Sequence, residues 1–146
     1  MLKSIIRILV PCLIFSGCVP KQVTNFTRYL HAVHGIEAGD QIYYVLNLQA
    51  PCDCVYQHLL MLAEADTLNN HTTLILIGKN EIIGRDSLLQ LIEQKAHRVL
   101  TDKKGKAWQY GIATLKPMLF RYDNLWPTSK VIQDNEVGIV KEIIGR

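Results

Sequence analysis

Two apolar runs with few polar interruptions, separated by a segment with helical spacing, constrain the fold of this chain more than any other feature. The runs are Ile42–Leu48 and Thr72–Gly78, and their β-branched and aromatic residues are typical of strands that are covered on both faces. Between them, residues 55–68 place apolar side chains along one stripe of a helix. The sequence therefore predicts a strand–helix–strand unit at the centre of an α/β fold.

The rest of the chain adds shorter elements around this unit. Ser87 and Gln90 have the spacing of a capping box, which indicates the start of a helix over Leu88–Lys95. The other expected elements are a strand at Arg98–Thr101, a helical turn within Ala107–Ile112, a hairpin of Met118–Tyr122 and Lys130–Gln133, and a helix over Glu136–Ile144 with Asn135 as its N-cap. Alternating strands and helices followed by a hairpin and a helix imply a mixed central sheet flanked by helices.

Composition excludes several classes of protein. A length of 146 residues is typical of one domain, and 49% hydrophobic residues exclude wholesale disorder. The 16 basic and 13 acidic residues give a net charge of only +3, without the clustered basic residues of a nucleic-acid-binding surface. Four cysteines are too few for a disulfide-dense scaffold. We therefore expect a single packed domain with no nucleic-acid partner.

The first residues have the pattern of an export signal. Two basic residues precede an apolar run over residues 8–15, which is too short to cross a bilayer as a mature helix. Residues 14–18 (IFSGC) resemble a bacterial lipobox, which implies removal of residues 1–17 and attachment of lipid to Cys18. An ordinary secretory signal or an uncleaved anchor is the alternative interpretation.

A lipidated Cys18 would place the protein in the cell envelope. Two or more acyl chains on one residue anchor a protein stably, so we expect attachment to a bacterial membrane on the periplasmic side. Residues 18–40 are mixed polar and are expected to form a tether with a short helix around Phe26–Val33. Residues 41–146 are expected to form the folded domain.

Cys52 and Cys54 lie where the first expected strand gives way to the first expected helix. The unpaired N–H groups at a helix N-terminus favour a negative charge, which lowers the pKa of a thiol there. Asp53 between them has the opposite effect, because its charge opposes thiolate formation. A disulfide across one residue closes a very small ring, so it is easily reduced and stabilises the fold little. The pair therefore indicates redox chemistry more than structural cross-linking.

Three features of residues 41–146 resemble the thioredoxin-like superfamily. The first is the junction of a strand, a cysteine pair and a helix. The second is Gly111 and an aliphatic residue followed by Pro117 at the head of a hairpin strand, and the third is the closing hairpin and helix. The spacing differs from that of thioredoxins, because one residue separates the cysteines instead of two. Pro51 also stands where an aromatic residue is usual.

The resemblance implies a thiol–disulfide oxidoreductase. Cys52 would be the nucleophile, Cys54 would resolve the mixed disulfide, and Pro117, as a cis-proline preceded by Lys116, would hold the substrate backbone beside them. The implied partners are exported proteins with thiols or disulfides and a protein that donates or accepts electrons. No cofactor is expected, and the redox direction cannot be read from the sequence.

Two other functions are compatible with the same residues. Two thiolates and an imidazole form a soft metal site, so Cys52, Cys54 and His58 could carry copper or zinc. The plainer interpretation of His58 is a solvated residue on the polar face of its helix, with no metal bound. The third alternative is a non-catalytic thioredoxin-like scaffold that serves for protein contact.

Overall fold

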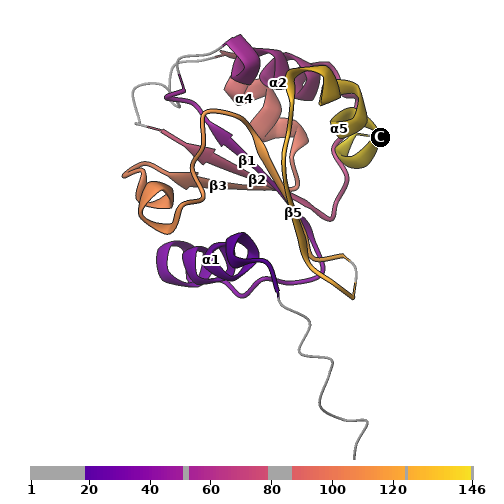
Figure 1. Cartoon of the computed structure of the whole chain (residues 1–146). Coiled ribbons are helices and arrows are strands. Elements are labelled where there is room, and N and C mark those ends of the chain that lie inside the picture. Colours follow the sequence, from indigo (N-terminus) through magenta and orange to yellow (C-terminus); the bar gives the residue numbers. More distant parts are fainter. Residues whose placement is uncertain (1–18, 51–52, 79–86, 124, 146) are drawn as a thin grey trace, which may run out of the picture.

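The chain folds around a mixed sheet of five strands (Figure 1). The computed structural model describes residues 19–50, 53–78, 87–123 and 125–145. The strands lie in the order β3-β2-β1-β4-β5. Their bounds are Ile42–Asn47 for β1, Thr72–Ile77 for β2, Arg98–Asp102 for β3, Met118–Arg121 for β4 and Thr128–Val131 for β5. The prediction of an α/β fold with a mixed central sheet is therefore confirmed.

The pairing of the strands gives the sheet its polarity. Strands β1, β2 and β3 are parallel, with Ile42 opposite Thr72, whereas β4 runs antiparallel to β1 with Met118 opposite Val45. Strand β5 returns antiparallel to β4, so the predicted hairpin is present, but its second strand covers Thr128–Val131 instead of Lys130–Gln133. Strand β1 pairs with β2 along its whole length and with β4 over Ile42 to Val45, and all six of its residues are buried. This explains why the strand is uniformly apolar up to Asn47.

Helices cover both faces of the sheet (Figure 1). One face packs against α2 (Asp53–Glu64), α4 (Ser87–Lys95) and α5 (Val137–Ile144), in a core that includes Tyr44, Leu46, Leu62 and Val140. The other face packs against α1 (Lys21–Tyr29), a π-helical turn at Leu30–His34 and a 3-10 helix at Lys106–Tyr110. Side chains alternate along β1 between the two cores, as the pleat of a strand requires.

The N-terminal helix is part of the domain, and the expectation of a tether over residues 18–40 is wrong for this helix. Phe26 is fully buried and stacks on Phe120 of β4, with the ring centroids 3.9 Å apart and the planes nearly parallel. Its edge-on contact with Tyr43 places it over β1 as well. The apolar residues of α1 thus form the second core together with the sheet, whereas Lys21, Gln22 and Arg28 are exposed.

The helix ends differ in detail from the expectation. Asn135 is not the N-cap of α5, because the chain first forms a 3-10 turn over Asp134–Glu136, and Glu136 then occupies the N-cap position. Gln133 and Glu136 form a reciprocal capping box on this turn. The helix predicted over Leu88–Lys95 is present as α4, but it begins one residue earlier, with Ser87 as its first residue.

The expected signal segment over residues 1–17 and the lipidated Cys18 lie outside the described residues. Within residues 19–50, 53–78, 87–123 and 125–145, no helix is both long enough and apolar enough to cross a bilayer.

We predict that Phe26→Ala lowers the free energy of unfolding by about 3–5 kcal/mol, because it removes a fully buried aromatic ring between α1 and the sheet. Urea denaturation of the full chain measures this change. Arg28→Ala, on the exposed side of the same helix, is the control and should alter stability by less than about 0.5 kcal/mol. Equal, small effects of both substitutions would show that α1 does not support the domain.

Candidate functional site

The candidate site lies where β1 ends and α2 begins. Asn47, the last residue of β1, is buried and uses both ends of its side-chain amide. Its Nδ2 donates to the carbonyl oxygen of Thr114 at 3.2 Å, and its Oδ1 accepts from the backbone N–H of Gln49 at 3.1 Å. Asn47 therefore joins the β1–α2 junction to the loop before β4, although the two are distant in the sequence.

The structure gives the position of one cysteine backbone in this junction. Cys54 lies in the first turn of α2, directly after Asp53, the first residue of that helix. The first four backbone N–H groups of an α-helix have no partner within the helix, so this turn is electropositive. Cys52 and the side chain of Cys54 lie outside the described residues. The predicted position of Cys54 at the strand–helix junction is thus confirmed for its backbone.

The loop before β4 brings Pro117 to the same end of the sheet. Met118 pairs with Val45, so Pro117 lies alongside the final residues of β1. The loop is closed by hydrogen bonds from the Thr114 hydroxyl to the carbonyl of Lys116 and from the N–H of Ile132 to the carbonyl of Pro117, the latter at 2.9 Å. Pro117 itself is buried, which leaves little of its ring available for contact.

The implied cis-proline is not found. No peptide bond among the described residues is cis, and these include the bond between Lys116 and Pro117. The chain passes directly from the Thr114 turn into β4. The Pro117 carbonyl accepts the hydrogen bond from the N–H of Ile132, just after β5. A trans bond, which is the lower-energy form for most X–Pro pairs, satisfies this geometry.

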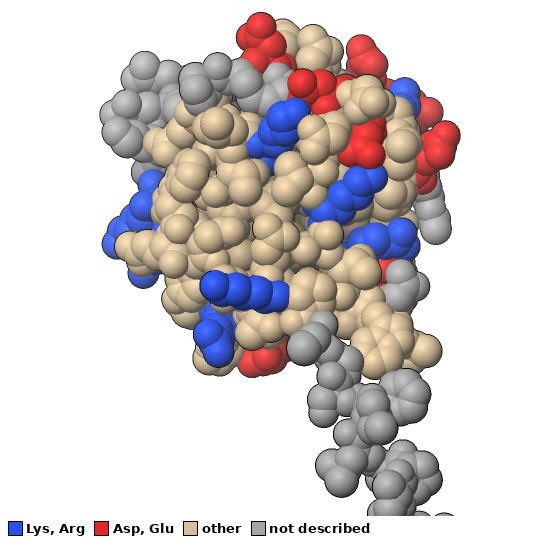
Figure 2. All heavy atoms as spheres, in the orientation of Figure 1, with Lys and Arg blue, Asp and Glu red and all other residues tan. Residues whose placement is uncertain are grey.

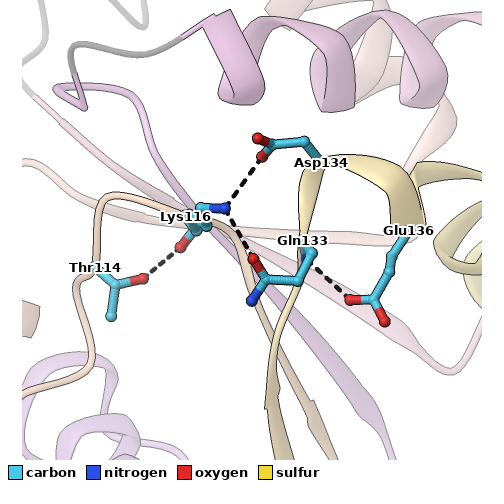
Figure 3. A network of polar contacts seen from close by, with 5 residues as sticks. All are labelled: Thr114, Lys116, Gln133, Asp134 and Glu136. Carbon is cyan, nitrogen blue, oxygen red and sulfur yellow. Dashed lines mark hydrogen bonds and ion pairs between the residues drawn. The ribbon is translucent and has the colours of Figure 1, made fainter.

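Lys116 connects the loop to the segment before α5 (Figure 3). Its Nζ donates to Oε1 of Gln133 at 2.8 Å and lies 3.5 Å from a carboxylate oxygen of Asp134. Glu136 extends the same network by accepting from the backbone N–H of Gln133 at 2.9 Å, and this hydrogen bond, with one from Lys130, lowers the pKa of Glu136. The ammonium group expected next to a substrate is therefore engaged in holding two loops together.

A buried tyrosine–histidine pair lies beneath the junction. His58 is fully buried, four residues after Cys54 on α2, and its Nδ1 is hydrogen-bonded to the hydroxyl of Tyr44 on β1. Its Nε2 has no hydrogen-bond partner among the residues that the structure describes. Burial lowers the pKa of His58, against a smaller opposing effect of Asp134, and burial also raises the pKa of Tyr44. The interpretation of His58 as a solvated surface residue is therefore wrong.

The structure does not assemble the proposed metal site within its described part. No group of three potential metal ligands occurs among residues 19–50, 53–78, 87–123 and 125–145. Of Cys52, Cys54 and His58, only the His58 side chain is described, and its free Nε2 is the one feature that suits a ligand.

Four residues with a part in this site were missed from the sequence: Tyr44, Asn47, Thr114 and Asp134. Asn47 could have been recognised, because a polar residue at the end of a buried strand needs hydrogen-bond partners. Tyr44 and Asp134 carry no such signal, since their partners become neighbours only after β1, α2 and the hairpin have packed together.

We predict that acid destabilises the protein through His58. The folded state holds this ring neutral, whereas the unfolded chain binds a proton below its ordinary pKa of 6.5. The free energy of unfolding should therefore fall as the pH decreases below about 6.5, with a contribution from His58 of at most about 1.4 kcal/mol per pH unit. Urea denaturation at a series of pH values should show a flatter profile for His58→Gln.

Tyr44→Phe is the matched control for this experiment. It removes the hydroxyl but keeps the imidazole buried, so the acid dependence should persist while stability falls by about 1–3 kcal/mol at every pH. A profile that is the same in His58→Gln and in the natural protein would contradict the role of His58.

Comparison with known proteins adds no relative from which a function could be transferred. No family model, no curated protein sequence and no solved structure matches this chain. What the site does must therefore follow from the residues at the junction of β1 and α2.

Proposed function

We propose that this protein is a membrane-anchored thiol–disulfide oxidoreductase that exchanges a Cys52–Cys54 disulfide with exported proteins. The observation that carries the proposal is the position of Cys54 in the first turn of a twelve-residue helix, which is the next element after the buried central strand β1. A thiolate at this position is stabilised by unpaired backbone N–H groups. The thiolate is the form of cysteine that attacks a disulfide.

The surroundings of the pair support this chemistry. The loop at Thr114–Pro117 is held against the junction by Asn47, so its backbone lies at the same sheet end as Cys54. Lys116 adds a positive charge there, although Asp134 partly neutralises it. The hairpin and closing helix α5 complete an arrangement similar to the thioredoxin-like fold, which we propose for residues 41–146. The trans bond before Pro117 is a departure from that family.

The reaction needs only the two thiols and a partner. The thiolate of Cys52 attacks one sulfur of a substrate disulfide, and the other substrate sulfur leaves as a thiolate and takes up a proton. The thiolate of Cys54 then attacks the sulfur of Cys52, which releases the second substrate thiol and leaves the pair oxidised. A partner protein that supplies two electrons and two protons restores the thiols, and the reverse sequence donates a disulfide.

The lipid anchor on Cys18 forms part of the same proposal. Its support is the lipobox-like pattern of residues 14–18 and the export-signal pattern before it. Anchoring outside the inner membrane places the pair in a compartment where disulfides form and persist.

We predict that Cys52 and Cys54 titrate reversibly as one two-electron couple. Equilibration of the full chain in thiol–disulfide buffers, followed by alkylation and mass measurement, should show both thiols changing together, with a tenfold change in ratio for about 30 mV. Cys52→Ser should abolish turnover of a model disulfide peptide. Unchanged turnover in this variant would support the non-catalytic scaffold, and the absence of any reversible titration would contradict the redox function.

A pair of charge variants on α2 gives a matched control for the same experiment. Asp53→Asn removes the negative charge beside the cysteines and should lower the pH of half-maximal thiol alkylation. Glu64→Gln makes the same chemical change at the last residue of the helix, one helix length away, and should leave that pH unchanged. Equal shifts in both variants would contradict a local electrostatic effect.

One observation favours a second candidate function, the binding of copper or zinc. His58 keeps Nε2 buried without a partner while Tyr44 holds Nδ1, and outer hydrogen bonds of this kind orient metal-bound imidazoles. His58 also lies one helical turn after Cys54, so a ligand set of Cys52, Cys54 and His58 would be local in sequence.

We predict substoichiometric metal in the full chain after purification under reducing conditions, as expected for an oxidoreductase. Elemental analysis of the natural protein, His58→Gln and the exposed control His97→Gln should give equal, low copper and zinc contents. One metal ion per chain that is lost in His58→Gln but kept in His97→Gln would replace the redox function with the carrier.

A further inference from the structure

The turn between β4 and β5 exposes two large apolar side chains. Leu125 is 96% exposed and Trp126 is 60% exposed, and Val19, before α1, is 47% exposed. Leu125 and Trp126 are called the hairpin tip below. Single exposed apolar residues are common on proteins, but a nearly bare leucine next to a tryptophan suits contact with an apolar partner.

The hairpin is fastened to the beginning of α1. Ser129 of β5 donates to the side-chain oxygen of Gln22 at 3.1 Å, and the hydroxyl of Tyr122 donates to the carbonyl of Val23 at 3.2 Å. The Thr27 hydroxyl lies 2.8 Å from the same Tyr122 hydroxyl. Figure 1 shows the turn of the hairpin and the start of α1 at the same end of the molecule.

This arrangement brings the proposed anchor to the hairpin tip. Cys18 precedes Val19 in the chain, and consecutive Cα atoms are about 3.8 Å apart. Acyl chains on Cys18 would therefore start within a few residues of Gln22, which itself contacts the hairpin. A membrane that held these acyl chains would be near the turn that carries Leu125 and Trp126.

The chemistry of the hairpin tip suits a lipid surface. Tryptophan is enriched at the boundary between lipid headgroups and acyl chains, where its ring is apolar and its N–H remains hydrated. Arg121 and Asp123 neutralise each other through a 2.7 Å ion pair, so the turn carries little net charge. Most of the acidic side chains visible in Figure 2 lie at the opposite end, over α2 and α5, where they would not be repelled by anionic lipid.

We infer that Leu125 and Trp126 insert into the surface of the membrane to which Cys18 is anchored, which rests on the lipid anchor proposed above. The anchor and the hairpin then form two contacts on one rigid end of the domain, and these set its orientation. Arg121 pairs with the first residue of β1, whereas α2 follows the last residue. The cysteine junction is thus held at the end of β1 away from the lipid, about 16 Å along the strand.

Fluorescence from the two tryptophans tests this orientation. The full, acylated chain is reconstituted into vesicles of phosphatidylethanolamine and phosphatidylglycerol, with and without bromine-labelled acyl chains. Trp108→Phe leaves Trp126 as the single tryptophan, and its emission should fall about two-fold with the brominated lipid, because bromine quenches indoles at the depth of the acyl chains.

Trp126→Phe provides the matched control. It leaves Trp108, which is 49% exposed and belongs to the 3-10 helix whose Tyr110 packs against Tyr29 at the far end of α1. Its emission should not change with the brominated lipid. The comparison uses two tryptophans of similar exposure, so a difference between them reports position relative to the membrane.

Three results would overturn the inference. Equal quenching of both tryptophans would indicate a contact without orientation. A blue-shifted but unquenched Trp126 would show that a protein surface, such as a second copy, covers the hairpin tip. A chain whose mass shows no acyl groups removes the anchor and the inference together, yet it leaves the redox titration of Cys52 and Cys54 as a separate result.

Discussion

The complete burial of β1 is the constraint on which the other elements depend. This strand pairs with β2 on one edge and β4 on the other, and helices cover both of its faces. Buried backbone N–H and C=O groups need hydrogen-bond partners, which β2 supplies along the whole strand and β4 supplies over Ile42 to Val45. Asn47 and the start of α2 lie at one end of this strand, and the hairpin tip lies at the other.

The strands could be predicted because burial on both faces leaves a continuous apolar run, and the runs at residues 42–48 and 72–78 match β1 and β2 closely. The packing of α1 was missed for a different reason. This helix carries many polar residues, and its few apolar positions, among them Val23 and Phe26, form a narrow stripe. The burial of that stripe depends on Phe120 and Tyr43, which are distant in the sequence and form the surface that it covers.

The candidate site was predictable only in part. The pattern of a strand followed by a cysteine pair and a helix located the junction, because this information is local in the sequence. The environment of His58 was not local: its burial depends on Tyr44, which belongs to a different element, and polar character alone suggested exposure. The same holds for Lys116, whose partners Gln133 and Asp134 are supplied by the segment after the hairpin.

The side chain of Asn47 links the segment that follows β1 to the Thr114 segment, because it is hydrogen-bonded to both. To shift the Thr114 segment outward, the chain must break the hydrogen bond from Nδ2 of the buried Asn47 to the Thr114 carbonyl. Such a movement costs free energy whether or not a ligand is bound. The segments around Asn47 and Thr114 are consequently held in place relative to each other, so a polypeptide bound in the proposed reaction would have to adapt to their arrangement.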